Sequence, residues 1–117
     1  MIRVYHNNRC SKSRGACDIL KENGIEAEII EYLKTPPTET EILEILSKLG
    51  MKASEIVRRG EEIYKKSFAG REYTESEWVK ILSENPILIE RPIIINGDKA
   101  VIGRPLEKVN DIIKSAS

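Results

Sequence analysis

The first third of the chain alternates between strand-like and helix-like patterns of apolar positions. Residues 2–6 alternate apolar with polar side chains and include β-branched and aromatic types, which predicts a strand. Residues 11–23 repeat apolar side chains at helical spacing before Gly24, which predicts a helix that ends there. Residues 25–33 predict a second strand. The strand–helix–strand order implies a parallel pair with a right-handed crossover.

The block from about 38 to 85 has helical periodicity. Thr38 with Glu41 three residues later is a capping-box pattern, and Thr74 with Glu77 repeats it. Each pair precedes apolar residues at helical spacing, which predicts two longer helices. We therefore expect this block to be a helical insertion.

Strand patterns return between Pro86 and Gly103. Two apolar runs flank Asn96-Gly97-Asp98-Lys99, and Asn-Gly favours the positive φ angles of a tight hairpin turn. Pro105 suits the first turn of a last helix. The order β-α-β, helical insertion, β-β-α predicts an α/β fold with a mixed central sheet. We expect residues 1–117 to form a single domain.

Composition and charge narrow the classes of protein. The chain has 117 residues, of which 40% are hydrophobic and 32% charged, which is typical of a soluble globular protein. Nineteen basic residues balance nineteen acidic ones, so no overall basic field favours nucleic acid or a membrane surface. Because neither a signal peptide nor a run of about 20 apolar residues is present, we expect a cytoplasmic protein. We also expect a monomer.

Two cysteines, Cys10 and Cys17, lie seven positions apart in the sequence. If the segment is helical, a rise of about 1.5 Å per residue separates them by roughly 10 Å. A disulfide needs Cα atoms within about 7 Å, so we expect these two thiols not to pair. With a single histidine there is also no zinc-type cluster, so we expect no bound metal.

Cys10 carries the strongest chemical signal in the sequence, because it lies where the first strand gives way to the first helix. Free N–H groups and partial positive charge at a helix start stabilise a thiolate and lower its pKa. The Ser13 hydroxyl could donate a hydrogen bond to the sulfur, and nearby cations add positive charge: Arg9, Lys12 and Arg14. Since residue 13 is serine, Cys10 has no partner thiol in a Cys-x-x-Cys pair, and an external thiol must resolve whatever forms on it.

Each of these residues also has an ordinary structural interpretation. Free cysteines are often small buried hydrophobes, but the polar neighbours of Cys10 disfavour that role there. Cys17 shares a face with Ala16 and Leu20, which favours packing over chemistry. His6, at the end of the first strand, could assist Cys10 or could be structural.

Arginines supply the second signal. Arg58 and Arg59 end the predicted short helix of the insertion, and Arg91 and Arg104 each precede a proline. A residue before proline is driven into extended backbone, which fixes where its side chain leaves the sheet edge, and the Arg91–Pro92 bond is a candidate for the cis form. A single arginine is usually a surface residue. Guanidinium groups gathered around one thiolate would bind a tetrahedral oxyanion.

Three segments of the sequence resemble the glutaredoxin- and glutathione-dependent arsenate reductase family, and its short arsenate reductase-like members. They are Tyr5-His6-Asn7-Asn8-Arg9-Cys10-Ser11-Lys12-Ser13-Arg14, Pro86-Ile87-Leu88-Ile89-Glu90-Arg91-Pro92-Ile93 and Ile102-Gly103-Arg104-Pro105. The resemblance covers nearly the whole chain. One departure is Asn8, where many relatives have proline, and this could loosen the loop before the cysteine.

The resemblance implies a thioredoxin-like fold with a helical insertion. It implies that Cys10 is the nucleophile and that Arg58, Arg91 and Arg104 bind the oxyanion, with His6, Ser13 and Arg14 in support; whether Arg58 or Arg59 faces the site stays open. Arsenate or a related oxyanion would be the substrate, glutathione the co-substrate and glutaredoxin the partner, with no bound cofactor and no metal.

Two other functions compete with arsenate reduction. Spx-type regulators share this fold and bind RNA polymerase without turnover, and those with a redox switch use a Cys-x-x-Cys pair that Ser13 denies this chain. A thiol reductase acting on a non-arsenate substrate would keep Cys10 and change only the oxidised partner.

Overall fold

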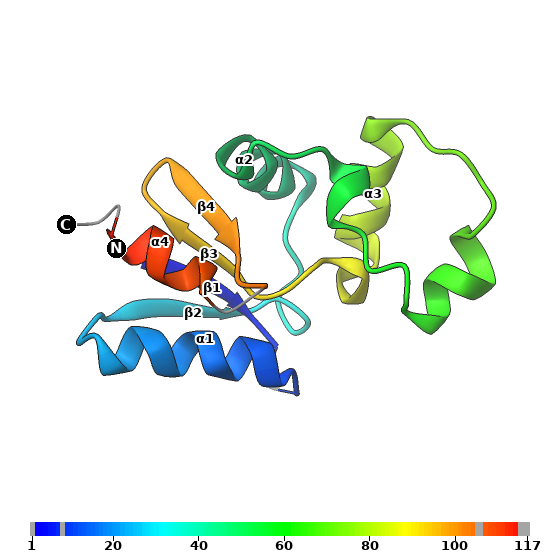
Figure 1. Ribbon diagram of the computed structural model, residues 1–117. Coiled ribbons are helices and arrows are strands. Elements are labelled where there is room, and N and C mark those ends of the chain that lie inside the picture. Colours follow the sequence, from blue (N-terminus) through cyan, green and yellow to red (C-terminus); the bar gives the residue numbers. More distant parts are fainter. Residues whose placement is uncertain (1, 8, 105–106, 115–117) are drawn as a thin grey trace. The chain divides into compact units, whose positions relative to one another are not determined.

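The computed structural model describes residues 2–7, 9–104 and 107–114. Asn8 and Pro105, on which two of the sequence expectations rest, lie outside the described residues. The chain divides into two units, one formed by Met1–Thr35 with Arg91–Ser117 and the other by Pro36–Glu90 (Figure 1).

The first unit is built on a four-stranded sheet in the order β2-β1-β3-β4. Strand β1 (Ile2–His6) pairs in parallel with β2 (Ala27–Glu31), and the connection runs through helix α1 (Ser11–Glu22). Gly24, with φ of 67°, follows the helix and donates its N–H to the carbonyl of Lys21 at 3.0 Å. The parallel pair is therefore confirmed, and β2 is shorter at both ends than the predicted strand.

The other half of the sheet is antiparallel. Strand β3 (Ile93–Asn96) runs antiparallel to both β1 and β4 (Lys99–Ile102), and helix α4 (Lys108–Lys114) follows β4. The mixed sheet confirms the predicted fold class. The hairpin is also confirmed, but Asn96 closes β3 and Gly97 alone has a positive φ, of 63°. A two-residue loop with glycine in its first position needs positive φ only there.

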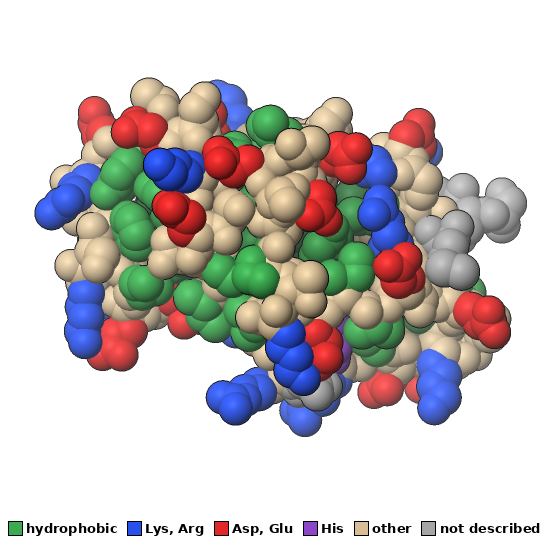
Figure 2. Space-filling model, turned by 180° about the vertical axis from the view of Figure 1, so that it is seen from behind, with side chains coloured by type: hydrophobic (Ala, Val, Ile, Leu, Met, Phe, Trp, Pro, Cys, Tyr) green, Lys and Arg blue, Asp and Glu red, His purple; other side chains and the backbone are tan. Residues whose placement is uncertain are grey.

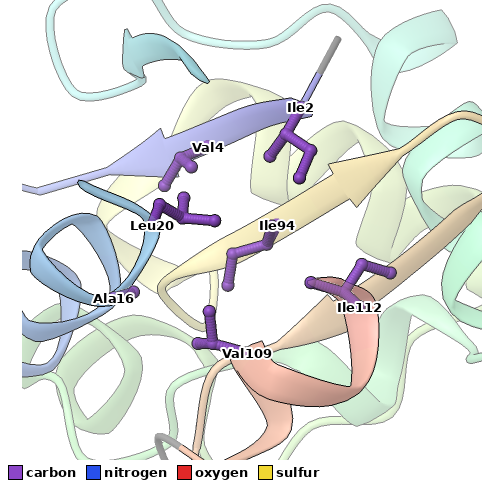
Figure 3. Packing of buried hydrophobic residues seen from close by; sticks show 7 residues of the cluster. All are labelled: Ile2, Val4, Ala16, Leu20, Ile94, Val109 and Ile112. Carbon is purple, nitrogen blue, oxygen red and sulfur yellow. The ribbon is translucent and has the colours of Figure 1, made fainter. Parts of the chain in front are cut away.

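The hydrophobic core of the first unit lies on one face of this sheet. Helices α1 and α4 both pack there, and their apolar side chains meet those of β1 and β3 (Figure 3). The cluster consists of Ile2, Val4, Ala16, Leu20, Ile94, Val109 and Ile112. Because α1 is fixed along its length by this burial, the start of α1 is held at the carboxyl end of β1.

The second unit contains two capped helices, α2 (Glu39–Leu49) and α3 (Glu75–Glu84). Thr38 and Thr74 each accept a hydrogen bond from the backbone N–H three residues on, and the glutamate there bonds back to the cap residue. Both predicted capping boxes are thus confirmed. The expectation that the chain is one domain with an insertion stays a prediction.

Three short helices complete the second unit: η1 (Ala53–Ile56), a π-helical turn η2 (Tyr64–Phe68) and η3 (Pro86–Leu88). The strand predicted from Pro86 onward begins too early: Pro86–Leu88 form η3, Ile89 makes an isolated bridge, and β3 starts only at Ile93. Proline has no N–H to give to a sheet ladder, and instead the N–H groups of Leu88 and Ile89 close a 3₁₀ turn on the carbonyls of Asn85 and Pro86.

We predict that Gly103→Ala destabilises the first unit by about 1–3 kcal/mol, because overpacking a filled core forces its neighbours apart. A Cβ atom at Gly103 would lie 2.9 Å from Pro92 Cγ, 3.2 Å from Ile94 Cδ1 and 3.3 Å from Val109 Cγ2. Urea denaturation measures the loss. Gly60→Ala is the control, because a Cβ there meets nothing within 4 Å; equal stability of the two variants would contradict the prediction.

Candidate active site

Cys10 is the N-cap residue of α1, as the sequence predicted for the strand–helix junction. Its backbone is extended, with φ of −98° and ψ of 119°, and its N–H donates to the carbonyl of Asn7 at 3.0 Å. Two side chains tie the loop: Asn7 Oδ1 accepts from the N–H of Arg9 at 3.0 Å, and Ser13 Oγ accepts from the N–H of Asn7 at 3.1 Å. The loop therefore presents the sulfur at the start of the helix.

Positively polarised groups surround the sulfur of Cys10. Arg104 Nη2 donates to Sγ at 3.3 Å, and the Arg91 side chain also bonds to it. The backbone N–H groups of Lys12 and Ser13, in the first turn of the helix, also favour the thiolate and lower the pKa of Cys10. Ser13 thus acts on the sulfur through its N–H, whereas its hydroxyl, which the sequence singled out, accepts from Asn7.

These contacts make the thiol more acidic than an ordinary cysteine. Burial raises the pKa of Cys10. This effect is outweighed by groups that lower the pKa: the N–H of Ser13, the Arg91 side chain and its charge, and the N–H of Lys12. The net pKa therefore lies below the usual value. For Arg91, burial lowers the pKa, because it disfavours the charged guanidinium. The hydrogen bond to Cys10 and the interactions with Tyr32 outweigh burial, so the net pKa of Arg91 lies above its usual value. The pair is thus stabilised in its ionised form.

Cys10 is buried together with a charged neighbour. Cys10 is only 8% exposed, and Arg91 beside it is also 8% exposed. Arg104 Nε donates to the carbonyl of Arg91 at 2.7 Å, which links the two arginines through the backbone. The Arg91–Pro92 bond is cis, as the sequence suggested. The low exposure of Cys10 therefore comes with charged and N–H partners, and differs from that of a cysteine in an apolar core.

Cys17 has a different environment, although it lies on the same helix. It packs against the core cluster, as predicted, and its Sγ lies 3.7 Å from Nδ1 of His6. Burial and the charge of Asp18 raise its pKa. Both cysteines are free thiols, as expected from their spacing. The assistance of His6 to Cys10 that the sequence suggested stays a prediction.

The remaining predicted residues differ in what they contact. Arg14 is exposed, and its N–H donates to the carbonyl of Cys10 at 3.1 Å. Arg58 belongs to the second unit, where its Nε bonds to Glu61 at 3.1 Å. Arg59 is more fully engaged, because Nη1 donates to Tyr64 and Nη2 to the carbonyl of Ser54. A role of Arg58 in binding an oxyanion stays a prediction.

Two residues that sequence reasoning did not single out support the site. Asn7 holds the loop through its backbone and its side-chain oxygen. Tyr32 is fully buried, and its interaction with Arg91 favours the charged guanidinium. A tyrosine next to the end of an apolar strand gives little warning of this role in the sequence.

The structure also gives the distribution of surface charge, of metal-ligating side chains and of long apolar helices. Acidic and basic side chains are mixed over the face shown in Figure 2. Among the described residues, no group of three or more His, Cys, Asp and Glu side chains is gathered as a metal ion would require. Likewise, no described helix is long and apolar enough to cross a membrane.

The arrangement defines the class of protein. Cys10, with its lowered pKa, lies at the first strand–helix junction of a mixed sheet, and its partner Arg91 precedes a cis-proline. This arrangement is typical of thioredoxin-like thiol proteins. The ArsC family model matches residues 5–112, which include Cys10, Arg91 and Arg104. The chain belongs to the ArsC family.

Individual relatives can be aligned with this chain over almost its full length. The chain is 42% identical to the uncharacterised protein YfgD of Escherichia coli K12, over 96% of each chain. It is 37% identical to an arsenate reductase of Neisseria meningitidis, covering 96% of this chain and 97% of the relative. The solved arsenate reductase from Vibrio cholerae superposes with a TM-score of 0.90 at 35% identity, covering 95% and 96% of the two chains.

We predict that Arg91→Gln raises the pKa of Cys10, because the substitution removes a charge and alters a hydrogen bond that favour the thiolate. The rate of Cys10 alkylation by iodoacetamide against pH, followed on the Cys10 peptide by mass spectrometry, reports this pKa. Arg14→Gln is the control, since the exposed Arg14 side chain has no recorded contact with the sulfur. Equal displacement of both profiles would show that general charge, not this contact, acidifies the thiol.

The same lowered pKa predicts a pH-dependent stability. An unfolded cysteine has a pKa of about 8.5. Between the folded-state pKa and that value the unfolded chain binds more protons, so the thiolate's contribution to stability grows with pH and is lost as pH falls through the folded-state pKa. Urea unfolding of wild type and Cys10→Ser across this range should show wild type gaining stability relative to the variant as pH rises. A constant difference would contradict it.

Proposed function

We propose that this chain reduces arsenate to arsenite through a covalent adduct on Cys10. The observation that supports this most directly is the contact of Cys10 Sγ with Arg104, next to Arg91, because one set of guanidinium groups serves both a thiolate and an oxyanion. Relatives named arsenate reductase at 33–41% identity over most of the chain support the oxidoreductase class.

The arginines would act on the substrate by charge and shape. Their planar forks match the edge of a tetrahedral oxyanion, and their positive charge offsets the charge that accumulates as the thiolate attacks. The hydrogen bond from Arg104 Nε to the carbonyl of Arg91 supports a joint role of the two arginines. Arg58 is proposed as the third oxyanion-binding arginine on the strength of the sequence resemblance. Phosphate and sulfate share the shape of arsenate but lack a comparable reduction by thiols.

The chemistry proceeds in three balanced steps. The Cys10 thiolate attacks arsenic(V), a sulfur–arsenic bond forms, and one oxygen leaves as water after taking up protons. The thiolate of glutathione then attacks the sulfur of Cys10. A disulfide forms, the sulfur–arsenic bond breaks, and its electron pair stays on arsenic, which leaves as arsenite. A glutaredoxin thiol attacks the glutathione sulfur of the mixed disulfide and releases the Cys10 thiolate.

An external thiol is required by the position of the second cysteine. Cys17 lies seven residues further along the same helix, about 10 Å away by helix geometry. It packs against the core and its pKa is raised, so it is a poor resolving thiol. Since thiols supply both electrons, the proposed reaction uses no resident metal or organic cofactor. The proposed reaction needs reduced glutathione, which fits a cytoplasmic location. One chain is sufficient for it, because every step uses the same Cys10.

We expect Cys10→Ser to abolish arsenate reduction in an assay coupled to glutathione, glutaredoxin and glutathione reductase, because a serine hydroxyl cannot be the redox-active sulfur. Consumption of NADPH and the arsenite formed measure turnover. Cys17→Ser is the matched control and should retain activity, since Cys17 packs against the core.

Other outcomes of this assay would favour the competing functions. Turnover of a glutathionylated peptide without any reduction of arsenate would indicate a thiol reductase with a different substrate. Absence of all thiol turnover, together with retrieval of RNA polymerase subunits in a pull-down, would indicate a regulator. Either result would contradict the proposed reduction of arsenate.

A further inference from the structure

A pocket opens in the first unit where its two parallel strands end. Its volume is about 480 Å³, within the range of roughly 300–1,000 Å³ that is usual for small-molecule pockets. Six residues line it: His6, Asn7, Arg9, Glu31, Leu33 and Lys34. His6 ends β1 and Glu31 ends β2, and the two are partners in the parallel register. Pockets at the carboxyl ends of parallel strands are a common place for ligands.

The pocket shares a loop with the reactive sulfur. Asn7 lines the pocket, and its carbonyl accepts the N–H of Cys10 at 3.0 Å. Arg9 also lines the pocket and directly precedes Cys10, and the Asn7 side chain fixes its backbone at 3.0 Å. A molecule bound in the pocket is therefore next to the loop from which the sulfur is presented.

The lining combines both signs of charge with an apolar side chain. Arg9 and Lys34 can each bind a carboxylate, Glu31 can bind an ammonium group, and Leu33, 37% exposed, offers apolar surface. Lys34 and Glu31 pair with each other at 3.4 Å, with side chains that are 76% and 38% exposed. An exposed pair of this kind contributes little, so a ligand that carries both charges can replace it at small cost.

We propose that this pocket binds the small peptide thiol that attacks Cys10, a ligand with more than one carboxylate, one ammonium group and a thiol. The inference deepens the proposed function and rests on its assignment of Cys10 as the reacting thiol. Arg9 and Lys34 hold the carboxylates and Glu31 holds the ammonium group. The bound thiolate attacks the Cys10 sulfur and forms a disulfide, while the electron pair of the broken bond leaves with the group previously attached to that sulfur.

The first experiment needs no arsenate. Oxidised glutathione converts the Cys10 thiolate into a mixed disulfide and releases one glutathione thiolate, and mass spectrometry of the Cys10 peptide gives the rate. Bis(2-hydroxyethyl) disulfide, which is neutral, reacts in the same way without the charged groups. We expect the double variant Arg9→Ala/Lys34→Ala to slow the reaction with oxidised glutathione by about fivefold to tenfold. The groups that lower the pKa of Cys10 are Arg91 and the backbone N–H groups of Ser13 and Lys12, not the side chain of Arg9 that the sequence suggested. The reaction with the neutral disulfide should therefore be unchanged.

Two further variants sharpen this comparison. Lys34→Glu reverses one charge and should slow the glutathione reaction more than Lys34→Ala does, again without effect on the neutral disulfide. Lys21→Ala removes an exposed cation of α1 that does not line the pocket, and it should change neither rate. Equal slowing with both disulfides would mean that the pocket residues act on Cys10 itself, and unchanged rates would mean that glutathione binds elsewhere; either result overturns the proposal.

The coupled arsenate assay separates this inference from the proposed function. If arsenate is reduced, the double variant should raise the KM for glutathione and leave the KM for arsenate unchanged. Arsenate turnover with an unchanged KM for glutathione would overturn the pocket proposal alone. Charge-selective reaction with oxidised glutathione, in a chain that fails to reduce arsenate, would overturn the arsenate assignment and support the pocket.

Discussion

The site depends on the stabilisation of one negative charge, on the sulfur of Cys10, by the buried guanidinium of Arg91. A buried charge without a partner is costly, so each member of this pair makes the burial of the other tolerable. The carbonyl of Arg91 also anchors Arg104, which brings a second guanidinium to the sulfur. Residues 10, 91 and 104 are far apart in the sequence, and the pairing of β1, β3 and β4 brings their segments together.

The same pairing has a chemical consequence. The guanidinium of Arg104 is bonded to the sulfur, so in the proposed reaction an oxyanion would share it. In that reaction the anion would take up part of the positive charge, and the thiolate would lose some of its stabilisation and become a stronger nucleophile. The backbone N–H groups of Lys12 and Ser13 belong to α1, which is fixed by its core contacts, and they would continue to lower the pKa of Cys10.

Local patterns in the sequence predict most of the fold. The capping boxes at Thr38 and Thr74, the end of α1 before Gly24 and the hairpin at Gly97 each follow from a few neighbouring residues. The 3₁₀ turn at Pro86 was missed because an apolar run has the same pattern in a strand and in a short helix. In the site, Cys10 is predictable from its junction. Tyr32 is not, because its contact with Arg91 depends on how distant segments pack.

The two cysteines show why position in the fold decides the chemistry. Both lie at one helix, yet the pKa of Cys10 is lowered and that of Cys17 is raised. Cys10 meets the unpaired N–H groups at the helix start and two arginines, whereas Cys17, two turns later, finds those N–H groups already used within the helix and has the charge of Asp18 nearby. A reaction that needs two thiols therefore has one in the chain and must recruit the other. The charged pocket at the ends of β1 and β2, beside the loop of Cys10, is where such a thiol can be held.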